Sequence, residues 1–141
     1  MATDFLERCD AIEECYEFML AYAGQGLPTE QGSQSGGRVR EFLQNAAGAL
    51  KGLAASCSRA IAESGHEPAA RHQAFISVLD RDAQDSLAAL ELVQAQPAIS
   101  SQLIDNLNAS VHLRALLTDL FLVGDILRSQ NKAVVSSTES S

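Results

Sequence analysis

Four polar side chains on one predicted helix are the residues best placed to do chemistry. They are Asp105, Asn108, His112 and Asp119, at successive spacings of three, four and seven residues. Such spacings place side chains near one line of an α-helix. A carboxylate and an imidazole one or two turns apart can hold a cation or orient each other. Asp105 and His112 are therefore candidate metal ligands; the alternative is a polar stripe that faces solvent or pairs with nearby arginines.

A mononuclear metal site needs a third ligand, which this stripe does not supply. Near the N-terminus, Asp10, Glu14 and Glu17 lie on another predicted helix. These carboxylates complete a ligand set only if they face inward. The metal hypothesis therefore depends on how the first helix is oriented.

Sequence signatures of catalysis and nucleotide binding are missing. The chain contains no GxSxG turn, no CxxC pair and no GxxxxGK[ST] loop. Its cysteines, Cys9, Cys15 and Cys57, lie on predicted helices with no histidine at close spacing. Cys9 and Cys57 also fall within apolar stripes, which is typical of buried, reduced thiols in a cytoplasmic protein. We therefore favour a non-enzymatic, cytoplasmic protein and expect no cofactor.

The net charge of −8 is unevenly distributed along the chain. The first predicted helix has an acidic face with spacings of three, four and three residues, formed by Glu7, Asp10, Glu14 and Glu17. Residues 37–64 instead hold four basic residues against two acidic ones. No basic stripe is long enough for nucleic acid or for an acidic membrane surface, so neither is expected as a partner. The acidic face should meet either the basic residues of 37–64 or a basic partner protein.

Four amphipathic segments and no convincing strand predict an all-α protein. The helices are expected at 4–23, 37–64, 68–96 and 101–129. The first helix repeats apolar residues every four and three positions, the seam spacing of a bundle helix. Ten core positions are expected, which are Ile12, Tyr16, Met19, Leu50, Leu53, Leu79, Leu90, Leu113, Leu117 and Leu120.

The later three helices have matching lengths and short connections. This pattern predicts a four-helix bundle with three long antiparallel helices and a shorter N-terminal helix. A loop rich in Gly, Ser and Gln follows the first helix, and its length permits either a turn back or a crossing of the bundle. We expect one domain over residues 1–132 and a disordered tail at 133–141. No segment approaches the roughly 18 uninterrupted apolar residues of a membrane-spanning helix.

The stretch Ala115–Val123 is apolar nearly all the way round its helix. A helix that is buried on one side needs only an apolar stripe. The stretch is therefore either the centre of the bundle or also a contact with a second copy. Leu116, Phe121 and Leu122 are candidate partner-binding residues, together with the acidic face of the first helix. Closed two-fold pairing is the commonest form of such self-association.

Two functional hypotheses remain from the sequence. The first is a helical protein-interaction module, such as an adaptor, assembly factor or regulatory subunit, that binds another protein and forms a homodimer. The alternative is a metal- or small-ligand-binding bundle that uses Asp105, His112 and the carboxylates of the first helix.

Overall fold

The computed structural model describes residues 2–65 and 69–139, with side chains described over 4–65 and 70–129. This part of the chain forms six helices and no strand, which confirms the all-α prediction. The helices are α1 (Ala2–Ala23), α2 (Gly36–Leu50), α3 (Leu53–Ser64), α4 (Ala69–Gln94), α5 (Ser101–Asn108) and α6 (Val111–Glu139). None of the described helices combines the length and apolar content needed to cross a membrane.

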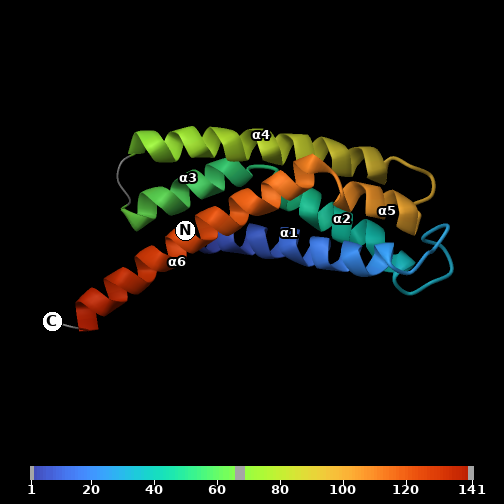
Figure 1. Cartoon of the computed structure of the whole chain (residues 1–141), viewed down its shortest axis with the longest axis horizontal. Helices are drawn as coiled ribbons and strands as arrows, with labels where there is room; N and C mark the ends of the chain where they lie inside the picture. The colour runs from blue at the N-terminus through green and yellow to red at the C-terminus, as the bar shows by residue number, and fades with distance from the viewer. Residues whose placement is uncertain (1, 66–68, 140–141) are drawn as a thin grey trace.

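The helices lie roughly along one long axis (Figure 1). α1 and α4 run in one direction along opposite edges, and α2, α3, α5 and α6 run in the other direction. α1 packs against α2, α3 and α5, whereas α4 packs against α2, α3, α5 and α6. The last turns of α6 extend beyond the other helices at the end where α3 leads to α4 (Figure 1).

The second predicted helix, 37–64, is two helices separated by Lys51 and Gly52. Gly52 has a φ of +80°, a left-handed conformation that ends a helix at little cost only for glycine. The Arg8 guanidinium of α1 donates hydrogen bonds to the carbonyls of Ala49, at 3.1 Å, and Lys51, at 2.6 Å. It thereby satisfies carbonyl groups that a helix end leaves without partners. A side chain from another helix therefore stabilises the break.

Substitution by alanine is expected to have opposite effects on stability at Gly48 and Gly52, which stand four residues apart. Gly52→Ala should lower the free energy of unfolding by about 1–2 kcal/mol, because alanine at a left-handed φ is strained. Gly48→Ala should instead be neutral or stabilising by up to about 1 kcal/mol. Gly48 lies inside α2 and an added Cβ would meet nothing within 4 Å. Urea unfolding of both variants tests this; equal effects would show that the Gly52 conformation is not needed.

The predicted helix 101–129 is also divided, at Ala109 and Ser110. Ser110 accepts a hydrogen bond from the Leu113 N–H at 3.3 Å, which starts α6 as a new helix. Ser100 caps the start of α5, since its hydroxyl accepts a hydrogen bond from the Leu103 N–H at 3.0 Å. The prediction of two long uninterrupted helices is therefore wrong for these segments.

The predicted helix lengths need further correction. The 22-residue α1 is longer than α2 or α3, which have 15 and 12 residues. The third predicted helix ends at Gln94, and its predicted first residue, Pro68, lies outside the described residues. α6 runs to Glu139, so the backbone of 133–139 is helical, while 140–141 lie outside the described residues. The division into a domain at 1–132 and a disordered tail stays a prediction.

The loop after α1 turns back at one end of the molecule and is tied to the start of α5. Ser101 connects three segments: its hydroxyl donates to the carbonyl of Tyr22 at 2.6 Å and accepts from the Leu27 N–H at 2.8 Å. The buried Tyr22 hydroxyl donates to the carbonyl of Ile99 at 2.6 Å. These bonds fix the end of α1 against the connection between α4 and α5.

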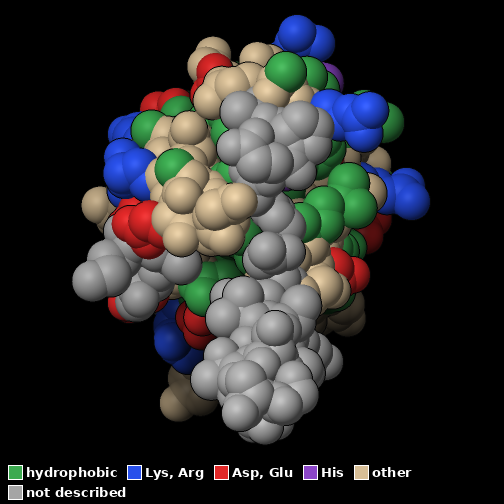
Figure 2. All heavy atoms as spheres, turned by 90° about the vertical axis from the view of Figure 1, so that its left-hand side faces the viewer, with side chains coloured by type: hydrophobic (Ala, Val, Ile, Leu, Met, Phe, Trp, Pro, Cys, Tyr) green, Lys and Arg blue, Asp and Glu red, His purple; other side chains and the backbone are tan. Residues whose placement is uncertain are grey.

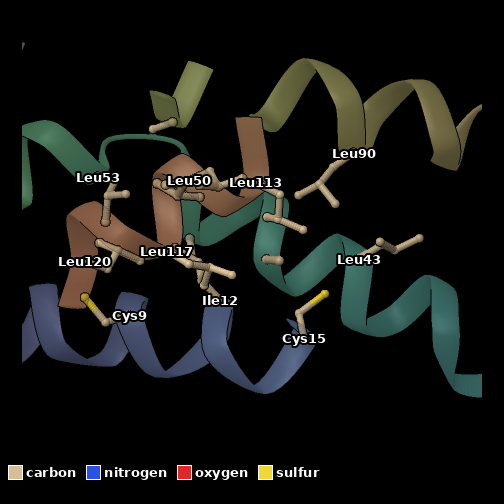
Figure 3. Close-up of a cluster of buried hydrophobic side chains, with 14 of the residues drawn as sticks. Cys9, Ile12, Cys15, Leu43, Leu50, Leu53, Leu90, Leu113, Leu117 and Leu120 are labelled. Atoms are coloured by element: carbon tan, nitrogen blue, oxygen red, sulfur yellow. The ribbon is translucent and has the colours of Figure 1, made fainter. Parts of the chain in front are cut away.

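The core takes buried side chains from all six described helices, including Ile104 and Leu107 of α5, and Figure 3 shows part of it. Nine of the ten predicted core residues are buried, and Tyr16 is partly buried against the core. Cys9, Cys15 and Cys57 are free and buried, as the sequence predicts. Burial raises the pKa of each thiol to about 12. The thiolate, which is the reactive form, is therefore scarce at neutral pH.

Candidate functional site

Three large apolar side chains stand exposed close together on α6. Phe121 is 53% exposed, Leu122 50% and Ile126 41%; we call these residues the α6 apolar patch. Leu122 and Ile126 are four residues apart and therefore neighbours on one helix face. Among the described residues, no other two large exposed apolar side chains lie within one turn of a helix. The patch thus differs from the isolated apolar residues that any protein surface carries.

Leu116, which the sequence assigned to partner binding, is fully buried at 0% exposure. The inward face of α6 is wide, because Leu116 and its neighbour Leu117 are both buried. The apolar stretch Ala115–Val123 therefore has two causes: a broad core face and an exposed patch beside it. Leu116 belongs to the first, whereas Phe121 and Leu122 belong to the second.

A mostly apolar cavity of about 290 Å³ adjoins the patch. It lies between the end of α3, the first turns of α4 and the middle of α6, and we call it the α3/α4/α6 cavity. Its lining residues are Ile61, Arg71, His72, Phe75, Leu122, Val123, Ile126 and Leu127. Figure 2 views the molecule from this end and shows hydrophobic side chains at the surface among Lys and Arg side chains.

The acidic face of α1 is exposed at all four predicted positions, Glu7, Asp10, Glu14 and Glu17. Within the described side chains, none of the four forms an ion pair. Two of the four basic residues of 37–64 have other ion-pair partners: Arg40 pairs with Glu30 at 3.3 Å, and Arg59 with Asp4 at 3.5 Å. The acidic face was predicted to meet either the basic residues of 37–64 or a basic partner protein. Ion pairing of this face with α2 or α3 is not observed among the described side chains.

The two candidate metal ligands lie on different helices. Asp105 is exposed on α5, and His112 is exposed on α6 after the break at Ala109 and Ser110. The nearest acidic partner of His112 is Asp85 of α4, with Nδ1 and Oδ2 3.9 Å apart. In the described part of the chain, no three His, Cys, Asp or Glu side chains are grouped to hold a metal ion. The structure thus supplies no third ligand for this pair.

The other two members of the polar stripe, Asn108 and Asp119, are buried. Asp119 lies beside Asp82 of α4. Burial, followed by a hydrogen bond and the like charge of Asp82, raises the pKa of Asp119 to about 7. The close approach of these two carboxyl groups was not predicted from the sequence. Asp82 stands three residues after the buried Leu79 and four before the buried Ser86, which is the spacing of an inward position.

Comparison with known proteins adds no assignment. No protein-family model matches the chain, and searches of curated proteins and of solved structures found no match.

Proposed function

We propose that this protein is a non-enzymatic helical interaction module that forms a homodimer through the α6 apolar patch. Adaptor, assembly factor and regulatory subunit are the roles that such a module serves. The observation that carries the proposal is the exposure of Leu122 and Ile126 side by side on one helix face, with Phe121 exposed on the adjoining flank.

Burial energetics support a contact at this patch. Removing a half-exposed Leu or Ile side chain from water contributes about 1 kcal/mol. A stable interface buries about 1,200–2,000 Å² in total, which exceeds the area of three side chains. The patch therefore acts as the centre of a larger contact in which α6 crosses its own copy. Two-fold pairing covers both patches at once and leaves none exposed.

The scaffold for this contact is a four-helix bundle in our proposal. α2 with α3, and α5 with α6, each take the place of one long helix, and α1 and α4 are the other two. The packing of α4 against both α3 and α6, and of α1 against α2 and α3, supports this interpretation.

The acidic face of α1 is a second proposed contact, for a basic partner protein. Four exposed carboxylates without an ion pair attract positive charge over a distance set by ionic strength. Such a face raises the association rate more than the affinity, and the effect weakens with added salt.

Reversing two of these charges tests that contact. Glu14→Lys with Glu17→Lys should leave the melting temperature nearly unchanged, because exposed substitutions usually change stability by about 0.5 kcal/mol or less. The double variant should bind a basic partner more slowly at low salt. Thermal unfolding and stopped-flow association measure the two effects. An unchanged association rate would remove the acidic face from the function.

Leu122→Glu is the variant that tests the dimer contact. A charged side chain at a half-exposed position is tolerated in the monomer but costly within an apolar interface. We therefore expect a folded monomer, measured by circular dichroism and sedimentation velocity. Leu92→Glu is the matched control, because Leu92 is 66% exposed on α4 and outside the patch; it should remain a dimer. A dimer that persists in Leu122→Glu would place the interface elsewhere.

A further inference from the structure

The α3/α4/α6 cavity has the composition of a small-ligand site. Six of its eight described lining residues are apolar: Ile61, Phe75, Leu122, Val123, Ile126 and Leu127. Its volume of about 290 Å³ is near the lower end of the roughly 300–1,000 Å³ of known ligand pockets. The cavity therefore suits a short aliphatic chain better than a large, rigid ring system.

Burial along α6 shows how such a chain can enter. Val123 and Leu127 are 3% and 7% exposed and form the inner wall, whereas Leu122 and Ile126 are about half exposed. The opening to solvent therefore lies on the side of Leu122 and Ile126. An aliphatic chain placed there would cover apolar surface that now faces water.

The polar groups of the cavity favour a negative charge on the ligand. Arg71 is exposed, and it forms no ion pair with any described side chain. It stands in the first turn of α4, whose N-terminal end carries partial positive charge. Among the described side chains, no acidic residue lines the cavity. A guanidinium group matches a carboxylate with two parallel hydrogen bonds, which adds a directional preference to the charge.

We infer that the α3/α4/α6 cavity binds an aliphatic carboxylate, with the hydrocarbon chain inside and the carboxylate on Arg71. The chain length fits a medium-chain fatty acid. The proposed dimer contact also uses Leu122 and Ile126, so the ligand and a second copy of the chain compete for this surface, and the carboxylate site is that of the monomer. For this reason the decisive variant changes Arg71, which is not part of the α6 apolar patch.

Decanoate is the probe, and decanol is the uncharged comparison of equal chain length. Isothermal titration below the micellar concentration should give decanoate an affinity up to about fivefold higher than decanol, the difference that one exposed ion pair supplies. Arg71→Gln should reduce decanoate binding to the level of decanol. Arg81→Gln is the matched control, since Arg81 is exposed on the same helix but does not line the cavity; it should bind normally.

A second variant tests the cavity itself. Ile126→Trp places a large side chain at the opening, because Ile126 lines the cavity and is 41% exposed. Binding of both decanoate and decanol should fall together, while the helical circular dichroism spectrum is retained. Equal affinity for the two probes, decanoate binding that survives Arg71→Gln, or no decanoate binding to the unmodified protein would each overturn the assignment.

Discussion

Leu117→Ala should lower the free energy of unfolding by about 2–5 kcal/mol, the usual range for removing a buried leucine. Leu117 is 5% exposed, and in Figure 3 it lies in the cluster with Ile12 of α1, Leu50 of α2 and Leu120 of α6. Alanine would remove apolar contacts and leave a cavity that these helices cannot fully close.

Urea unfolding at one pH measures this effect. Leu92→Ala is the matched control, because a leucine that is 66% exposed should cost about 0.5 kcal/mol or less. A loss at Leu117 as small as that of the control would place this residue outside the core and contradict the packing of α6.

Asp119→Asn should make the free energy of unfolding less dependent on pH. It should also raise the free energy of unfolding at neutral pH and above. The pKa of Asp119 is about 7 in the fold against 3.8 as its ordinary value. Between these values the folded state binds more protons than the unfolded state, so the stability of the unmodified protein falls as pH rises. Asparagine mimics the neutral acid and can donate a hydrogen bond to Asp82.

The expected gain is fully present above pH 7 and is lost as the pH falls toward the ordinary pKa of an aspartate. Below pH 4 the variant and the unmodified protein should be equally stable. Urea unfolding from pH 4 to pH 8 measures both slopes. Asp105→Asn is the control, since Asp105 is exposed and should keep the slope of the unmodified protein. A variant at Asp119 that keeps that slope as well would show that the carboxyl is ionised in the fold.

The sequence predicted the helical class and most of the core because both depend on local spacing. Residues such as Ile12 and Leu53 repeat every three or four positions, and this period alone assigns them to an inward face. The helix breaks are harder to predict. The one at Gly52 depends on Arg8, which is more than forty residues away in the chain and reaches the end of α2 only in the fold.

The candidate site was predictable in part for the same reason. Excess apolar content in Ala115–Val123 indicated an exposed surface, and Leu122 is indeed half exposed. The spacing of the apolar residues did not show that Leu116 faces the core while Leu122 faces solvent. The width of the core face depends on how α6 packs against its neighbours. The α3/α4/α6 cavity is set by three helices that are distant in sequence, so no local pattern reveals it.

The central claim is self-association through α6, and sedimentation velocity of the unmodified full chain tests it most directly. At tens of micromolar, the account predicts a homodimer, in a concentration-dependent equilibrium with the monomer. The dimer should persist at high salt, since apolar contacts are not screened. A single monomeric species across this concentration range would contradict the account.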